Sequence, residues 1–174
     1  MRNPLRRRWL LAILVSLQIA VLAGMAISNA AVGWYGQQIT LKTAPVDPRD
    51  LFYGDYVVLR YEISSLDASM WTGAGQPSSK DMVYVKLRRS ADEGEIYEAV
   101  AVSPERPDTA ENEAVLRGQV RYAGGQEIQI RYGLERYYVP EGTGRAIEEE
   151  RVNLQAHVRI APWGQARIME LILP

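Results

Sequence analysis

The sequence predicts a mostly β protein that starts with a single membrane-spanning helix. Three observations indicate this class. Residues 9–32 carry no charge, the residues after 36 alternate between apolar and polar, and glycines and prolines interrupt the alternation at short intervals. Because short strands divided by regular turns are typical of antiparallel sheets, we expect a β-barrel or β-sandwich domain with one short helix.

The apolar run at residues 9–32 is long enough to cross a bilayer, since about 20 apolar residues in a helix span the hydrocarbon core. Arginines 6, 7 and 8 precede it. Basic residues mark cytoplasmic flanks. We therefore expect residues 1–8 to form a cytoplasmic tail and residues 33–174 an exported domain, held at the inner (cytoplasmic) membrane. Trp34 and Tyr35 would lie at headgroup depth.

A cleaved signal peptide is the alternative interpretation of the same run. Ser28-Asn29-Ala30 resembles a cleavage site of small residues. The apolar run is longer than the roughly 7–15 residues of a signal-peptide core, however. The length favours an uncleaved anchor.

Composition excludes several kinds of site. The 174 residues contain no cysteine, which excludes disulfides and thiolate metal ligands. Beyond residue 32 there are 16 basic and 21 acidic residues, a net charge of −5. An acidic domain is a poor electrostatic partner for nucleic acid, so no nucleic acid is expected. Neither a cofactor nor a metal is expected.

Alternation predicts eight strands. In residues 82–88, for example, Val83, Val85 and Leu87 fall on one side. Tight turns at Gly124-Gly125 and at 162–164 would each join two strands. The short helix is expected at 144–151, and a second helical segment at 65–70. The strands are predicted at 38–42, 56–63, 82–88, 96–102, 114–122, 127–132, 153–160 and 165–173.

Residues 54–61 (GDYVVLRY) lead from a Gly-Asp turn into one of these strands. Gly54 gives the turn its backbone freedom, and Asp55 can accept hydrogen bonds from nearby amides. In the strand, Val57, Leu59 and Tyr61 would share one face, opposite Tyr56, Val58 and Arg60. Asp55 is thus interpreted mainly as a turn-forming residue.

This segment resembles the signature of the GDYxxLxY family, and residues 132–144 (YGLERYYVPEGTG) resemble a second segment of that family. The resemblance implies a bacterial membrane-anchored protein, often encoded beside or fused to multi-spanning membrane proteins. It implies no activity. The named positions of the signature are filled by Gly54, Asp55, Tyr56, Leu59 and Tyr61.

The Arg-Tyr dipeptide recurs four times, at 60–61, 121–122, 131–132 and 136–137. In strands this pattern places arginines on one face and tyrosines on the other. Cross-strand pairing with Glu62, Glu127 and Glu135 is the ordinary interpretation. The alternative is a partner-binding surface, because Tyr and Arg are favoured interface anchors. The candidate binding residues are Asp55, Tyr56, Arg60, Tyr61, Glu135, Arg136, Tyr137 and Glu141.

Two enzyme-like or ligand-binding alternatives remain open. Asp55, Glu135 and Glu141 could form a carboxylate site for a cation or for general acid–base chemistry. A small ligand could instead occupy a pocket inside the barrel. His157 is the only histidine, so a zinc site is not expected.

The order of helix, Pro48, Gly54-Asp55 and a later Lys86 resembles type I signal peptidases. In that family a serine three residues before the proline is the nucleophile and the lysine is its base. Pro45 stands at that position here, so Lys86 has no hydroxyl to deprotonate. A degenerate signal-peptidase-like barrel is the most that this resemblance implies.

No complete catalytic constellation emerges, so we expect a protein that is not an enzyme. The expected function is to bind or stabilise a multi-spanning membrane protein in the bacterial envelope, with the bilayer contacted through residues 9–32.

Overall fold

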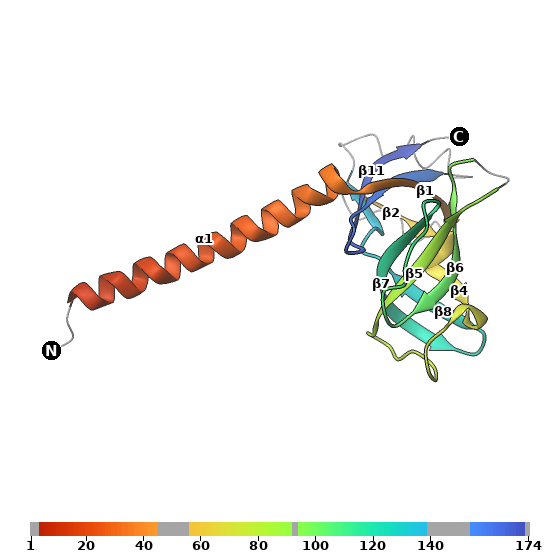
Figure 1. The fold of residues 1–174 in the computed structure, drawn as a ribbon, viewed down its shortest axis with the longest axis horizontal. Helices are drawn as coiled ribbons and strands as arrows, with labels where there is room; N and C mark the ends of the chain where they lie inside the picture. The colour runs from red at the N-terminus through yellow and green to blue at the C-terminus, as the bar shows by residue number, and fades with distance from the viewer. Residues whose placement is uncertain (1–3, 45–55, 92–93, 139–153, 173–174) are drawn as a thin grey trace.

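In a computed structural model of the chain, the described residues are 4–44, 56–91, 94–138 and 154–172. They form one long helix, α1 (Pro4–Tyr35), that projects from a compact group of β-strands (Figure 1). Every pairing between these strands is antiparallel. The predicted fold class is confirmed.

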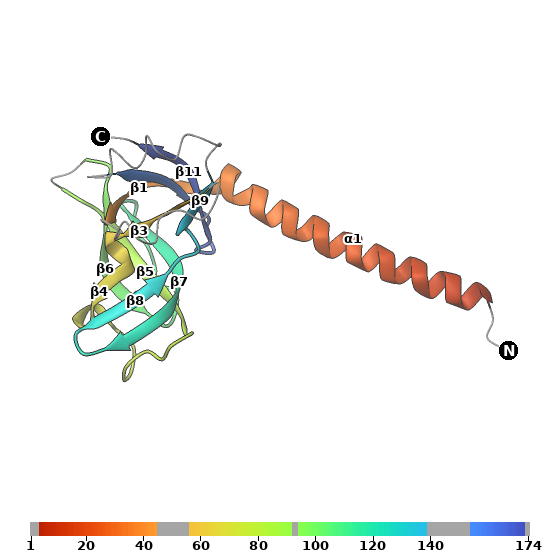
Figure 2. The same ribbon diagram turned by 180° about the vertical axis from the view of Figure 1, so that it is seen from behind.

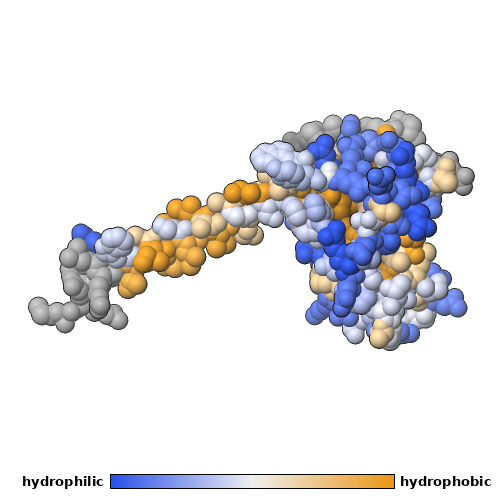
Figure 3. All heavy atoms as spheres, viewed as in Figure 1, coloured by the Kyte–Doolittle hydropathy of each residue, from blue (hydrophilic) through white to orange (hydrophobic). Residues whose placement is uncertain are grey.

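Helix α1 exposes its apolar side chains along most of its length (Figure 3). Its segment Arg8–Tyr35 is long and apolar enough to cross a membrane. The last turn differs, because Val32 is fully buried. The Arg159 guanidinium donates to the Gly33 carbonyl, and the Gly36 amide donates to the Val32 carbonyl at 3.1 Å. The helix therefore ends against the β domain.

Eleven strands follow α1 within the described ranges, and short 3-10 turns at Glu62–Ser64 and Ala68–Met70 interrupt them. The strands are β1 (Gln37–Ala44), β2 (Tyr56–Val58), β3 (Arg60–Tyr61), β4 (Ser65–Asp67), β5 (Met82–Arg89), β6 (Tyr97–Ser103), β7 (Glu113–Gly124), β8 (Glu127–Arg131), β9 (Arg136–Tyr138), β10 (Gln155–Ile160) and β11 (Ala166–Ile172).

The strands form a five-stranded sheet (β4-β8-β7-β5-β6), a four-stranded sheet (β11-β10-β1-β3) and a two-stranded ribbon (β2-β9). Strand β1 meets both ends of the larger sheet. Thr40 bridges to Ile96, next to β6, and Thr43 and Ala44 pair with β3, which leads into β4. The result is a nearly closed, barrel-like arrangement (Figure 2).

The core occupies the inside of this barrel. Val83, Val85 and Leu87 of β5 are fully buried, and Leu116 of β7 and Ile128 of β8 pack into the same cluster. Alternating apolar side chains from facing strands thus fill the interior, as the sequence pattern predicts.

The predicted strand at 56–63 is interrupted. The Leu59 amide makes the last bond of the β2–β9 ladder, to the Glu135 carbonyl at 2.8 Å, and the next residues, 60 and 61, pair with β1 instead. After Tyr61, whose amide donates to Ser64 Oγ at 3.2 Å, the chain turns into a 3-10 segment. The predicted faces are correct: Val57, Leu59 and Tyr61 are buried and Arg60 is exposed.

Two further expectations are corrected or fall outside the described residues. Residues 65–70 do not form one helix. Ser65–Asp67 pairs with β8, and only Ala68–Met70 makes a 3-10 turn, capped by the Ser69 amide donating to Asp67 Oδ1 at 2.8 Å. Strand β9 was not predicted. The helix expected at 144–151 lies outside the described residues.

Both predicted hairpin turns are confirmed. Gly125 at φ 63° joins β7 to β8, and Gly164 at φ 87° joins β10 to β11. Backbone in this left-handed region favours glycine, because a side chain would crowd the neighbouring carbonyl.

Leu59 is 4 % exposed, whereas the neighbouring Arg60 is exposed. We predict that L59A lowers the free energy of unfolding by about 2–5 kcal/mol, because truncation leaves a cavity in the core. R60A, the matched control, should change it by less than about 0.5 kcal/mol. Chemical denaturation of the full chain in detergent measures both. Equal effects of the two substitutions would contradict this assignment of faces.

Candidate functional site

The two segments that resemble the family signature lie side by side in the structure. Strands β2 and β9 pair in an antiparallel ribbon, with Val57 opposite Tyr137 and Val58 opposite Arg136. Residues nearly 80 positions apart in sequence therefore form one local unit. The following contacts show how that unit is held together.

Tyr61 and Tyr132, the tyrosine pair, exchange hydrogen bonds between the two segments. The Tyr61 hydroxyl donates to the Leu134 carbonyl at 2.9 Å, and the Tyr132 hydroxyl donates to the Ile63 carbonyl at 2.6 Å. Both rings are buried. Each tyrosine thus satisfies a backbone carbonyl just beyond the other tyrosine, where the regular ladder ends.

Burial raises the pKa of both Tyr61 and Tyr132, and the nearby negative charge of Glu135 raises it further. The two hydroxyls therefore stay protonated and remain donors. Glu135 itself accepts the Tyr132 amide proton, with 2.6 Å between nitrogen and Oε1. This carboxylate fixes the bend between β8 and β9.

A cavity of about 650 Å³ opens beside the tyrosine pair. Among the described residues, four arginines and one carboxylate provide its charged lining. Its walls come from β2, β5, β7, β8, β9 and the connection from β8 to β9. The lining residues are Val58, Met82, Arg117, Gly118, Gln119, Arg121, Arg131, Tyr132, Gly133, Glu135 and Arg136.

Several contacts position these arginines. Arg131 Nη2 donates to Gln119 Oε1 at 3.3 Å, and the Arg117 amide donates to the Gly164 carbonyl at 2.9 Å. Within the described part of the chain, Arg117, Arg121 and Arg131 have no ion pair to a carboxylate. The lining that the described residues provide is therefore cationic.

Gly118 forms part of the cavity wall. A Cβ added there would clash with the Ile130 side chain and would lie 3.0 Å from Cδ1 of the Tyr132 ring. The absence of a side chain at this position lets the Tyr132 ring lie directly against β7. The glycine thus helps to shape both the tyrosine pair and the cavity.

The structure brings together only some of the predicted site residues. Glu135 and Arg136 line the cavity, whereas Arg60 is exposed on β3. Tyr61 lies in the core at 1 % exposure, so it cannot contact a partner directly. Tyr137 is half-buried against the core, and Tyr56 lies in β2 opposite Tyr138. Asp55 and Glu141 lie outside the described residues.

The recurring Arg-Tyr dipeptides identify three of the four cavity arginines, although they were not interpreted as a cavity. Arg117 carries no comparable signal. The expected tyrosine face is wrong at Tyr122, which is 54 % exposed. A register shift between Val120 and Tyr122 disturbs the alternation of β7 there.

The cross-strand charge pairs expected for the arginine face are not among the ion pairs of the described residues, which join Glu113 and Glu95 to other partners. Glu127 instead accepts from the Ser65 hydroxyl and from Gln129 Nε2. The Ser65 hydrogen bond is the largest cause that lowers its pKa, and the positive charge of Arg60 lowers it further, as the expected pairing of these two residues predicts.

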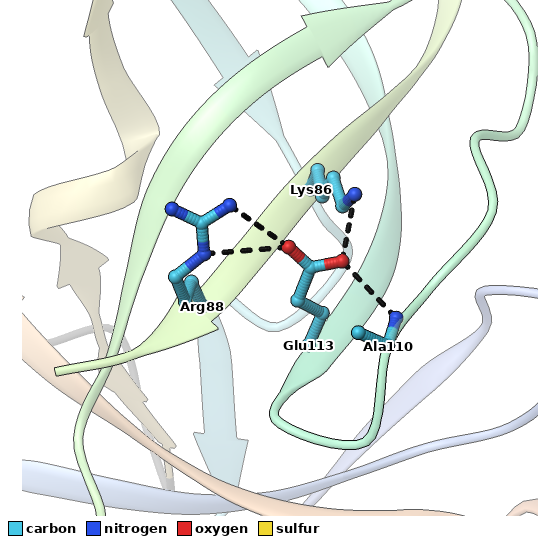
Figure 4. A network of polar contacts seen from close by, with 4 residues as sticks. All are labelled: Lys86, Arg88, Ala110 and Glu113. Carbon is cyan, nitrogen blue, oxygen red and sulfur yellow. Dashed lines mark hydrogen bonds and ion pairs between the residues drawn. The ribbon is translucent and has the colours of Figure 1, made fainter.

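Lys86 belongs to a structural network (Figure 4). Its Nζ lies 2.6 Å from Glu113 Oε2, which also accepts the Ala110 amide proton at 3.1 Å. Arg88 Nη2 lies 3.0 Å from the other carboxylate oxygen. These hydrogen bonds lower the pKa of Glu113 to about 2, and the bond from Lys86 makes the largest contribution. A lysine held this way is poorly placed to act as a base.

His157 is half-buried on β10, opposite Thr40 and Glu170. In the ranges that the structure describes, no three histidine, cysteine or acidic side chains gather as a metal site. Of Asp55, Glu135 and Glu141, only Glu135 lies in the described residues. The carboxylate site proposed for these three residues therefore stays a prediction.

Comparison with known proteins gives one match. The family model described as GDYXXLXY protein matches residues 18–171, which is most of the chain. Neither the curated proteins nor the solved structures searched contain a match.

Removing one hydroxyl of the tyrosine pair tests its contribution to stability. We predict that Y61F lowers the free energy of unfolding by about 1–3 kcal/mol, since the buried Leu134 carbonyl loses its donor. Y84F is a matched control, because the Tyr84 hydroxyl bonds to none of the described residues. Urea denaturation compares the two. An unchanged stability of Y61F would contradict the role of the pair.

The lowered pKa of Glu113 predicts an acid-dependent stability. An unfolded carboxyl takes up its proton near its ordinary value of 4.5, whereas the folded one does so near 2. The stabilisation is therefore complete above about pH 4.5 and is lost as the pH falls through about 2. Thermal melts between pH 7 and 2 should show a smaller acid-induced decrease in Tm for E113Q than for the wild type.

E98Q provides the control for this pH series, because Glu98 is exposed on β6. Its melting profile should follow the wild type at every pH. A parallel decrease in Tm for wild type and E113Q would assign the acid sensitivity to other groups.

Proposed function

The chain belongs to the GDYXXLXY family, and we propose that it is a membrane-anchored accessory protein whose β domain binds or stabilises a membrane-protein partner in the bacterial envelope. The observation that carries this proposal is the contrast between the two parts of α1. Most of the helix is bare and apolar, while its last turn is packed against the β domain.

The exposed apolar part of α1 is best explained by contact with a lipid bilayer. Side chains such as Leu10, Leu17 and Ile27 expose at least 60 % of their surface. So large a continuous apolar surface marks a contact with lipid or protein. Arginines 6, 7 and 8 at the start of the helix favour a cytoplasmic N-terminus, and in that orientation the β domain would lie outside the cytoplasm.

The packed part holds the domain next to that bilayer. Val32 is buried, and Arg159 bonds to Gly33, so the β domain cannot swing freely on a linker. Its surface would then be presented at a fixed height to other proteins in the same membrane. This supports an accessory function at a neighbouring membrane protein.

The β2–β9 ribbon is the surface that we assign to the partner. On β9, Arg136 and Tyr138 are both exposed, and Tyr138 exposes 72 % of its surface. Arg and Tyr are common anchors of protein interfaces. The ribbon lies on the side of the barrel from which α1 leaves (Figure 2). A partner in the membrane could reach it there.

We further propose that the domain acts by binding and not by catalysis. Lys86 is held in an ion pair with Glu113, and Glu135 accepts a backbone proton from Tyr132. Lys86 and Glu135 are the groups of the enzyme-like alternatives that lie in the described ranges. Both thus have structural roles. A degenerate signal-peptidase-like barrel is compatible with this proposal.

Site-specific photocrosslinking in intact cells tests the partner. A crosslinker replacing Tyr138 should capture a discrete multi-spanning membrane protein, because β9 would lie at the interface. The matched control is a crosslinker replacing Val100, which is 37 % exposed. Val100 lies on β6, the edge strand of the five-stranded sheet opposite β4, and β9 is not part of that sheet. Mass spectrometry of the adducts identifies the captured protein.

Two results would contradict the proposal. One is the same set of adducts from positions 138 and 100, which indicates nonspecific contact. The other is capture of only soluble proteins from position 138. Retention of the chain in membranes after a carbonate wash tests the anchor separately.

A further inference from the structure

We propose that the cavity lined by Arg117, Arg121, Arg131 and Arg136 binds the phosphate of an anionic phospholipid headgroup in the membrane that α1 enters. The proposal rests on the proposed function in one respect, namely that the β domain lies at the membrane surface. It adds a ligand class and a site, and that site shares Arg136 with the β2–β9 ribbon assigned to the partner.

The lining has the chemistry for a phosphate. Among the described residues, four arginines and one carboxylate line the cavity, and Glu135, that carboxylate, already accepts the Tyr132 amide proton. Arginine offers a planar fork of donors that matches phosphate oxygens in a bidentate manner. Since Arg117, Arg121 and Arg131 lack ion pairs to carboxylates among the described residues, their charge is available for a ligand.

The cavity also has the size and the support for such a ligand. About 650 Å³ falls within the range of small-molecule sites in proteins. The Arg131–Gln119 hydrogen bond at 3.3 Å and the backbone bond from Arg117 to Gly164 fix two of the arginines to the sheet. Gly118 and Tyr132 form part of the wall between them. The backbone that carries Arg117 and the Arg131 guanidinium are thus in place before a ligand arrives.

The location of the cavity, on the side of the domain from which α1 leaves, favours a lipid as the source of the phosphate. The connection from β8 to β9, which carries part of the cavity lining, lies on the α1 side of the barrel in both views (Figures 1 and 2). The turn between β10 and β11 contacts the same place: Ile160 pairs with Gln37 just after α1, and Gly164 bonds to Arg117.

Aromatic side chains mark the same side of the domain. Trp34 and Tyr35 at the end of α1 expose 77 % and 74 % of their surface, and Trp163 in the β10–β11 turn exposes 39 %. Trp and Tyr are enriched at the level of lipid headgroups. The arginine cavity therefore lies next to the residues that would meet the headgroup layer, where anionic phosphates are concentrated.

The test measures the Tm of the full chain in nonionic detergent micelles doped with phosphatidylglycerol or, at equal amount, with phosphatidylcholine. Phosphatidylglycerol should raise the Tm, because a ligand that binds only the folded state stabilises it. The rise should diminish at high salt. In R121Q/R131Q the lipid concentration that gives half of the effect should increase about tenfold or more. R89Q, on β5, should respond like the wild type.

Inorganic phosphate distinguishes the two possible sources of the anion. It should raise the Tm far less than phosphatidylglycerol at the same phosphate concentration. An equal rise would overturn the lipid assignment, as would identical responses to the two lipids. An unchanged response of R121Q/R131Q would place the effect elsewhere and overturn the site. R121K/R131K, which keeps the charge but not the fork, should respond more weakly than the wild type.

The carbonate wash of native membranes separates this inference from the proposed function. If the chain stays in the membrane but does not respond to phosphatidylglycerol, only the lipid site is wrong. If the wash releases the chain, the anchor is wrong whatever the lipid response.

Discussion

The hydroxyls of Tyr61 and Tyr132 each donate to a backbone carbonyl just beyond the other tyrosine, and this exchange joins two segments of the barrel that are distant in sequence. The chain needs it there because the strand that begins at Tyr56 is interrupted at Leu59 and ends at Tyr61. Where the ladder stops, buried carbonyls would lose their donors. The tyrosines supply those donors at 2.9 and 2.6 Å, and burial keeps them protonated by raising their pKa.

Other features follow from this junction. It keeps β2 beside β9 and fixes the bend from β8 into β9, where Glu135 and Arg136 lie. The Tyr132 ring lies against Gly118 and forms one wall of the arginine cavity. The packed end of α1 sets this wall on the side of the domain that faces the proposed bilayer. Stability and the proposed binding surfaces thus share residues, so the family signature is best understood as a structural motif that builds a surface.

Much of this fold is predictable from sequence, and the exceptions have physical reasons. Alternation identifies β5, β8 and β10 because each buries every second side chain, as Val83, Val85 and Leu87 show for β5. It fails for β4 and β9, since three residues are too few to display a period. The candidate residues Glu135 and Arg136 do line the cavity, but Tyr61 turns inward. Arg117 could not be found, because it lies outside the Arg-Tyr dipeptides and only the register of β7 on β8, with Gln119 opposite Arg131, brings it to the cavity.

Native-state hydrogen exchange of the Leu59 amide tests the junction most directly, because this amide donates to the Glu135 carbonyl at 2.8 Å and exchanges only when the two segments separate. If the tyrosine pair holds the segments as one cooperative unit with the barrel, this amide exchanges as slowly as those of β5 and β7, through global unfolding. Fast exchange at Leu59 while β5 and β7 stay protected would show that the segments open independently, and would contradict the central role of the pair.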